Sequence, residues 1–292
     1  MPLGDVKPGM RCTGLSVVRG TEISSFDVEI VDVIAAETGL SGPRILVRVS
    51  GPAIDATGIG PGFSGSPVIC DGRNAGAISE GLGDYGNDVA LATPIEEMIR
   101  DHPAAPPAST RRNPALLRAA HPLAIPLTVT GLSGRAATLM RQAALRARRP
   151  LIIAPAGPVV GYRPVDLRPG AAVAPSISTG DLALGAVGTV TYRNGEDLWA
   201  FGHPFEGVGR RALFPQDAYV YTVIENPLGI LEFPRDHVQA RLGRRLRAGG
   251  DHKGPGGYRL GKNRRAAAVD PASHRRAEQR GAADDARLTA GG

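Results

Sequence analysis

The chain has 292 residues and a formal net charge of +6, with 42% apolar residues, 4% aromatic residues, 39 glycines and 25 prolines. This composition favours short strands and turns over long helices, and no run approaches the roughly 18 consecutive apolar residues of a membrane span. Residues 235–292 hold 14 of the 34 basic and 6 of the 28 acidic residues, so the rest of the chain lacks the basic surface that binds nucleic acid, and no such partner is expected for it.

Residues 10–98 have the pattern of short β-strands. In FDVEIVDVI, residues 26–34, apolar and acidic residues alternate as in a half-buried strand, with one slip near Val31. RILVRVS, residues 44–50, alternates in the same way. Asp71-Gly72 predicts a hairpin turn between two further strands.

Two helices are predicted. The first begins at TPIEEM, with Thr93 as the N-cap, Pro94 in the first helical position and Glu96 completing a capping box. The second covers residues 131–149 and carries arginines along its outer face. Its inward-facing candidates are Ala137, Met140 and Leu145.

Further β-pattern follows this helix, and Asn194-Gly195 is a strong hairpin signal. No alternation of strands and helices is visible, which argues against a doubly wound fold and for a mainly antiparallel β protein. The sequence thus predicts four regions: a lobe over residues 1–102, a Pro/Ala-rich linker over 103–120, a helix and second β-rich lobe over 121–234, and a basic tail over 235–292.

The tail has neither helical nor strand periodicity and few large apolar residues, so it is expected to be disordered. Two alternatives stay open. An arginine-rich arm of this kind binds nucleic acid in other proteins. A shifted reading frame in a GC-rich gene would also yield a sequence rich in Arg, Ala and Gly and without periodicity downstream of Glu232.

The two cysteines, Cys12 and Cys70, are far apart in the sequence. They are expected to be small buried thiols, and the sequence neither requires nor excludes a disulfide between them. No further ligand pair accompanies them, so no metal and no cofactor is expected.

The stretch TGIGPGFSGSPVICDGRNAGAIS, residues 57–79, carries the strongest functional signal. A phosphate-binding loop would lead into a helix and usually contains a lysine, whereas these glycines lead into a strand and a turn. Ser64 stands instead in the pattern G-x-S-G-x-P, which resembles the G-D-S-G-G-P of chymotrypsin-like proteases. The plain alternative is a glycine-rich bend with structural serines.

Several motifs together resemble one family. They are VKPGMRCTGLSVV near the N-terminus, GFSGSPVICDGRNAGA around Ser64, and LATPIEEM at residues 91–98. The chain is similar in these to the SpoIVB-type serine endopeptidases, named after stage IV sporulation protein B, over residues 3–100 and, through AFGHPFEGVGRRALFPQDAYV, to about residue 230. The resemblance implies a two-lobed, chymotrypsin-like antiparallel β-barrel or sandwich with a few short helices.

The nucleophile expected from these patterns is Ser64, and the backbone N–H groups of Gly62 and Ser64 are the expected oxyanion donors. A serine protease also needs a general base and an acid that orients it. His203, in AFGHPF, is the one histidine within ordered β-pattern and the expected base. A turn histidine that caps backbone carbonyls is the alternative for His203, which follows the serine whereas the family's histidine precedes it.

The acid is less well defined. Where relatives carry an aspartate, the spacing falls on Ser50, and Asp55 is the nearest carboxylate. Asp55 is therefore the expected acid, unless the acid is missing from this chain. Asp84 and Asp88 are alternatives.

The resulting expectation is a serine endopeptidase that acts on a protein substrate in a signalling or processing role. The alternative is a catalytically inactive β module that binds a peptide or protein partner. The family resemblance implies an exported or membrane-associated protein, although residues 1–14 lack the features of a signal peptide. We expect that the native start lies upstream of Met1.

Overall fold

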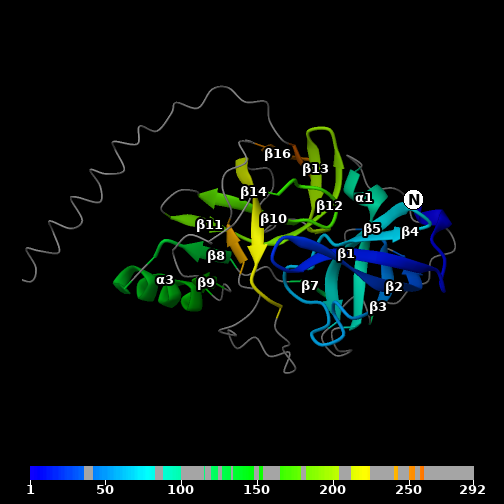
Figure 1. The fold of residues 1–292 in the computed structure, drawn as a ribbon, viewed down its shortest axis with the longest axis horizontal. Coiled ribbons are helices and arrows are strands. Elements are labelled where there is room, and N and C mark those ends of the chain that lie inside the picture. The colour runs from blue at the N-terminus through cyan, green and yellow to red at the C-terminus, as the bar shows by residue number, and fades with distance from the viewer. Residues whose placement is uncertain are drawn as a thin grey trace, which may run out of the picture. The chain divides into compact units, whose positions relative to one another are not determined.

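The protein is mainly β, as its computed structural model shows (Figure 1). The described residues all belong to the compact unit Met1–Gly261. They are residues 1–35, 42–82, 88–99, 115, 120–123, 127–132, 134–147, 151–153, 165–178, 182–203, 212–223, 240–242, 250–253 and 257–259.

The first sheet closes into a barrel. Its order is β4-β1-β2-β3-β6-β5-β7, and the further pairing of β4 with β5 joins six antiparallel strands into a ring. The predicted fold class, mainly β with a chymotrypsin-like antiparallel barrel, is thereby confirmed. The strands are β1 (Arg11–Arg19), β2 (Glu22–Ile34), β3 (Arg44–Ser50), β4 (Pro67–Cys70), β5 (Arg73–Leu82), β6 (Val89–Pro94) and β7 (Ala120–Pro122).

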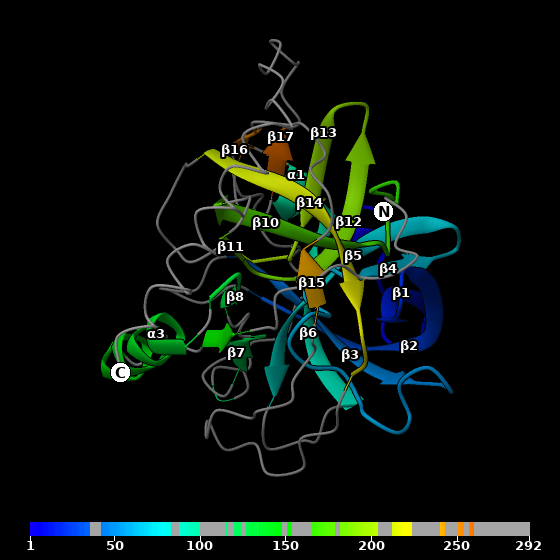
Figure 2. The ribbon, with the colours of Figure 1, turned by 60° about the vertical axis from the view of Figure 1, so that its left-hand side comes forward.

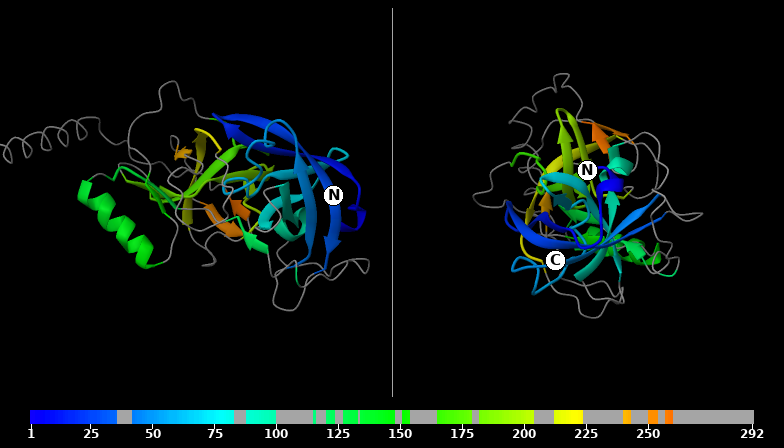
Figure 3. Two further views of the ribbon diagram at one scale, coloured as in Figure 1. Left: turned by 90° about the horizontal axis from the view of Figure 1, so that it is seen from below. Right: turned by 90° about the vertical axis from the view of Figure 1, so that its right-hand side faces the viewer.

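The alternating side chains predicted from the sequence fill this barrel. The long strand β2 is curved (Figure 3). Its residues Phe26, Val28 and Ile30 are buried, while the acids between them are exposed. The register between β2 and β3 shifts between Ile30 and Asp32, which confirms the predicted slip near Val31 as a bulge.

The second sheet contains another ring of strands. Its order is β15-β14-β16-β17-β13-β12-β10-β11-β8-β9, and β14 also pairs with β10, so that β14, β16, β17, β13, β12 and β10 form a closed circuit. Figure 2 shows the tall hairpin β12–β13 at one side of it. The strands are β8 (Leu127–Thr130), β9 (Leu151–Ile153), β10 (Ala172–Ser178), β11 (Ala183–Gly185), β12 (Gly188–Asn194), β13 (Asp197–Ala200), β14 (Ala212–Val220), β15 (Ala240–Leu242), β16 (Gly250–Lys253) and β17 (Gly257–Arg259).

Helices are few and short. A 3-10 turn covers Leu3–Asp5, α1 covers Ile95–Ile99, and α3 covers Gly134–Arg146 between β8 and β9 (Figure 1). Because β8 and β9 are parallel, this segment is a strand–helix–strand unit that the sequence pattern did not reveal. Across the described part of the chain, no helix has the length and apolar character needed to cross a bilayer.

Two details of the predicted helices are corrected. Of the three inward-facing candidates on α3, Ala137 is buried but Leu145 is 53% exposed, since the helix contacts the sheet through little more than one edge. Thr93 does not cap α1. Its hydroxyl donates to Ser79 Oγ at 3.0 Å, and the residue belongs to β6, so α1 begins only at Ile95.

Both predicted hairpins are confirmed. β4 and β5 turn at Asp71-Gly72, whose φ angles of 50° and 72° are left-handed. β12 and β13 turn at Gly195, with Asn194 paired to Asp197. In both turns a residue with positive φ matches the twist of the strands that it connects.

Four short segments lie outside the regions predicted for them. β7 pairs with β5 at the edge of the first sheet, and the buried Leu123 packs in the first core, although both follow the expected linker, most of which lies outside the described residues. In the tail, β15, β16 and β17 pair with β14 and β13, so disorder does not hold for residues 240–242, 250–253 and 257–259. Backbone hydrogen bonds to strand edges order these segments, although they have few apolar side chains to bury.

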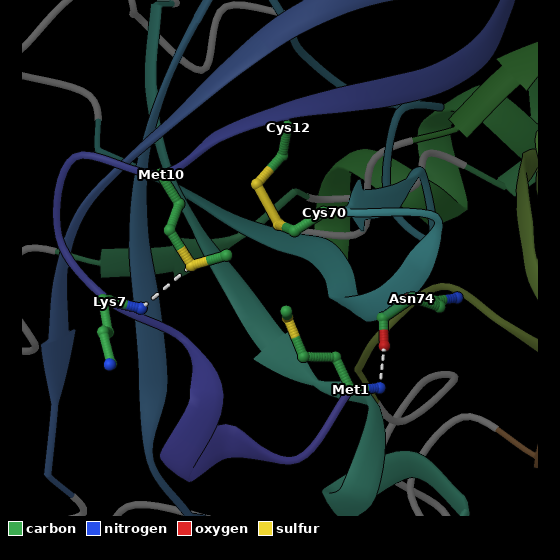
Figure 4. The surroundings of a disulfide bond; sticks show 6 residues. All are labelled: Met1, Lys7, Met10, Cys12, Cys70 and Asn74. Carbon is green, nitrogen blue, oxygen red and sulfur yellow. Dashed lines mark hydrogen bonds between the residues drawn. A yellow bond between two sulfur atoms is a disulfide. The ribbon is translucent and has the colours of Figure 1, made fainter.

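Cys12 and Cys70 form a disulfide bond, which corrects the expectation of two thiols (Figure 4). Their strands are neighbours, because Thr13 pairs with Ile69 in β1 and β4. The bond therefore cross-links β1 to β4, the strand that begins three residues after Ser64.

Reduction of this bond is expected to destabilise the fold by about 2–4 kcal/mol, because a cross-link between residues 58 apart restricts the unfolded chain. Urea unfolding with and without dithiothreitol measures the effect. The double variant Cys12→Ala/Cys70→Ala is the control and should not respond to the reductant. An unchanged midpoint for the wild-type protein would contradict the bond.

Candidate active site

The Ser64 turn, defined here as residues 60–66, leads directly into β4. Ser66 N–H donates to Phe63 O at 2.9 Å, which reverses the chain around the serine. Gly62 and Gly65 flank the reversal with φ angles of 101° and 97°. Side chains at either position would be strained, so the spacing of these two glycines determines the shape of the turn.

Strand β12 of the second sheet donates hydrogen bonds to three carbonyl oxygens of the Ser64 turn. The backbone N–H of Thr189 donates to Ser64 O at 2.9 Å, its hydroxyl donates to Gly62 O at 3.0 Å, and the Thr191 hydroxyl donates to Gly65 O at 2.7 Å. The carbonyl groups of Gly62, Ser64 and Gly65 are thus directed toward β12.

Gly65 lies too close to the second sheet for any side chain. A Cβ atom built on it would overlap the backbone oxygen of Thr189 and the backbone nitrogen of Phe201. Glycine is therefore required here by both backbone angle and space.

The Ser64 hydroxyl group is completely buried, and its Oγ has no hydrogen-bond partner among the described residues. Within the same part of the chain, the backbone N–H groups of Gly62 and Ser64 donate no hydrogen bond. Phe63, between them, packs edge-on against Phe26 with ring centroids 6.2 Å apart. A hydroxyl group beside two uncommitted backbone N–H groups has the composition of a nucleophile and its oxyanion hole.

His203 follows β13 in a sharp turn. Phe201 and Gly202 both have left-handed φ angles, 69° and 67°. For a buried phenylalanine this conformation is strained, and such strain often occurs at functional sites. The Phe201 ring lies 6.1 Å from the His203 ring, and the histidine is only 8% exposed.

The serine and histidine turns lie against the same backbone atom. Gly65 N–H donates to Ile78 O of β5 at 2.7 Å, and a Cβ atom on Gly202 would lie 3.2 Å from that oxygen. The residues directly after Ser64 and directly before His203 therefore share one short stretch of β5. No hydrogen bond joins Ser64 Oγ to the imidazole.

Asp55 occupies a different environment from a catalytic acid. Its side chain is exposed, and Oδ1 accepts a hydrogen bond from Gly51 N–H at 2.6 Å. The carboxylate thus stabilises the turn after β3, where Ser50 is also exposed. Of the alternatives, Asp88 is exposed and Asp84 lies outside the described residues.

Thr189 and Thr191 belong to the candidate site but were not revealed by the sequence. They flank Val190 in β12, and this alternation of polar and apolar residues indicates a strand. It does not indicate which segment the polar face of that strand contacts. Asp217 of β14 is the most buried carboxylate among the described residues, and its Oδ2 accepts a hydrogen bond from Val165 N–H at 2.7 Å. Its burial likewise depends on strand pairing that the sequence does not specify.

A scan of protein-family models, a search of curated proteins and a search of solved structures each found no match. The resemblance to SpoIVB-type endopeptidases therefore stays a prediction, supported by the motifs quoted above.

Substitution Gly65→Ala is expected to lower the free energy of unfolding by about 2–4 kcal/mol, because it introduces both an unfavourable φ and a backbone overlap. Gly60→Ala is the matched control. Gly60 has open space around its Cβ position, and the change should stay within about 0.5 kcal/mol. Urea unfolding measures both, and equal stabilities would contradict the close contact between the turn and β12.

Proposed function

We propose that the protein is a serine endopeptidase that hydrolyses peptide bonds of a protein substrate, with Ser64 as the nucleophile. The main support is the Ser64 turn itself. It holds a buried hydroxyl group between glycines with positive φ. Three of its carbonyl oxygens are bound by β12, and the N–H groups of Gly62 and Ser64 are uncommitted among the described residues.

In the proposed acylation, Ser64 Oγ attacks the scissile carbonyl carbon and His203 accepts the hydroxyl proton. The carbonyl oxygen takes the negative charge and is stabilised by the N–H groups of Gly62 and Ser64. The C–N bond then breaks, and the leaving amine takes the proton from His203. The bond between Ser64 Oγ and the acyl carbon completes this half of the reaction.

In deacylation, water replaces the amine. His203 accepts a proton from water, the resulting hydroxide attacks the acyl carbon, and the proton returns to Ser64 Oγ as the C–O bond breaks. The structure has no bond between Ser64 Oγ and the imidazole, so this mechanism requires the two side chains to come within hydrogen-bond distance in the substrate complex, where such bonds often tighten.

One observation favours the second candidate, a catalytically inactive β module that binds a peptide. The expected acid, Asp55, is exposed and bonded to Gly51 N–H. A serine and histidine without an orienting acid lose much of their reactivity. The two candidate functions predict different reactivities for Ser64: a peptidase requires a nucleophilic hydroxyl group, and a peptide-binding module does not.

The disulfide bears on location. Disulfide bonds persist mainly in oxidising compartments outside the cytosol, and Cys12–Cys70 joins two adjacent strands of the barrel. The bond supports our proposal of an exported protein, and the resemblance to SpoIVB-type enzymes supports a signalling or processing role.

Labelling with an alkyl fluorophosphonate, followed by intact-mass spectrometry, tests the activity. The wild-type protein should be labelled and Ser64→Ala should not. Ser66→Ala is the matched control, because Ser66 is equally buried two residues away and should leave labelling intact. His203→Gln should slow labelling at least about 100-fold.

Equal labelling of Ser64→Ala and the wild-type protein would contradict the assignment of Ser64 as the nucleophile. A folded wild-type protein that resists the reagent would support the peptide-binding module instead.

A further inference from the structure

A small cavity adjoins the Ser64 turn. It has a volume of about 10 Å³ and lies where β1, β10, β12 and β14 approach residues 62–63. Its lining consists of Val17, Gly62, Phe63, Ala172, Val187, Thr189, Val220 and Val223.

We propose that this cavity receives the side chain of the substrate residue whose carbonyl Ser64 attacks, and that it selects a small aliphatic side chain, alanine before all others. The inference rests on the proposed peptidase function and extends it to the class of substrate.

Position is the first reason. The cavity is lined by the two residues that precede Ser64 and by Thr189, which holds Ser64 O at 2.9 Å. In the acylation step the substrate oxygen lies at the N–H groups of Gly62 and Ser64. The substrate side chain is two bonds from that carbonyl carbon, so a hollow beside Gly62 is within its reach.

Polarity is the second reason. Apart from Thr189, the side chains that line the cavity are aliphatic or aromatic, and none among these described residues is charged. A lysine, arginine or aspartate side chain would lose its water here without gaining a partner. Charged substrate residues are thus disfavoured.

Size is the third reason. A cavity of about 10 Å³ has room for about one water-sized group, and the side chain nearest to that size is a methyl group. The surrounding Val17, Val187 and Val220 are buried in the interior, where close packing resists expansion. A leucine or phenylalanine side chain would have to displace these walls.

The walls are also fixed by backbone pairing. Gly20 N–H donates to Val220 O at 2.6 Å, and Val220 N–H donates to Gly20 O at 2.9 Å. These bonds join the end of β1 to the end of β14. Ser16 and Thr189 add a contact between their hydroxyl oxygens at 3.2 Å. The cavity is therefore a preformed feature at the junction of the two sheets.

Peptidyl α-aminoalkylphosphonate diphenyl esters test this inference, because the side chain on the carbon attached to phosphorus takes the place of the substrate side chain. Ser64 Oγ forms a bond to phosphorus, one P–O bond to phenoxide breaks, and the phenol leaves with the serine proton transferred through His203. Intact-mass spectrometry gives second-order rate constants for the alanine, valine, leucine, phenylalanine and lysine esters.

The alanine ester should react at least about tenfold faster than the leucine, phenylalanine and lysine esters, since differences of one or a few methylenes in a pocket give factors of this order. Val187→Ala should raise the ratio of the leucine to the alanine rate by about tenfold. Val47→Ala is the matched control, because it truncates a buried valine of the first barrel that does not line the cavity.

The fluorophosphonate experiment separates the two possible failures. Labelling of Ser64 together with equal or faster reaction of the large or charged esters would overturn the selectivity and leave the peptidase intact. An unchanged ratio in folded Val187→Ala would overturn the assignment to this cavity. Absence of fluorophosphonate labelling would remove the peptidase and the inference with it.

Discussion

The contact between β12 and the Ser64 turn is the interaction on which the rest of the site depends. Thr189 and Thr191 supply three hydrogen bonds to turn carbonyl groups from more than 120 residues away. The N–H groups of the same peptides, on Phe63, Gly65 and Ser66, are bonded as well, to Gly60 O, Ile78 O and Phe63 O. A single strand from the second sheet thus binds three carbonyl groups around Ser64, while the N–H groups of Gly62 and Ser64 stay uncommitted among the described residues.

Local features of the fold were predictable because their causes are local. Alternation of apolar and acidic residues in β2, including the slip at Val31, depends only on which side chains reach the barrel interior. The turns at Asp71-Gly72 and Gly195 follow from residues that tolerate positive φ. The turn around Ser64 could be predicted in the same way, since its conformation depends on the flanking glycines with positive φ.

Features that depend on distant partners could not be predicted. Cys12 and Cys70 bond because β1 and β4 are neighbours, and neither residue signals that pairing. Thr93 binds Ser79 across β5 and β6 and so does not cap a helix. Asp55 lies near Ser64 in sequence, but its carboxylate is exposed and accepts a hydrogen bond from Gly51 N–H, a partner that the sequence does not indicate.

The distance in sequence between the turn and β12 has a consequence for biosynthesis. A ribosome-bound chain that ends before residue 188 has the serine and its glycines but none of the groups that orient their carbonyls. Contacts of such long range form late in folding. The arrangement around Ser64 can therefore form only after the second sheet has been synthesised and docked, so the proposed activity would be confined to a chain that already contains β12.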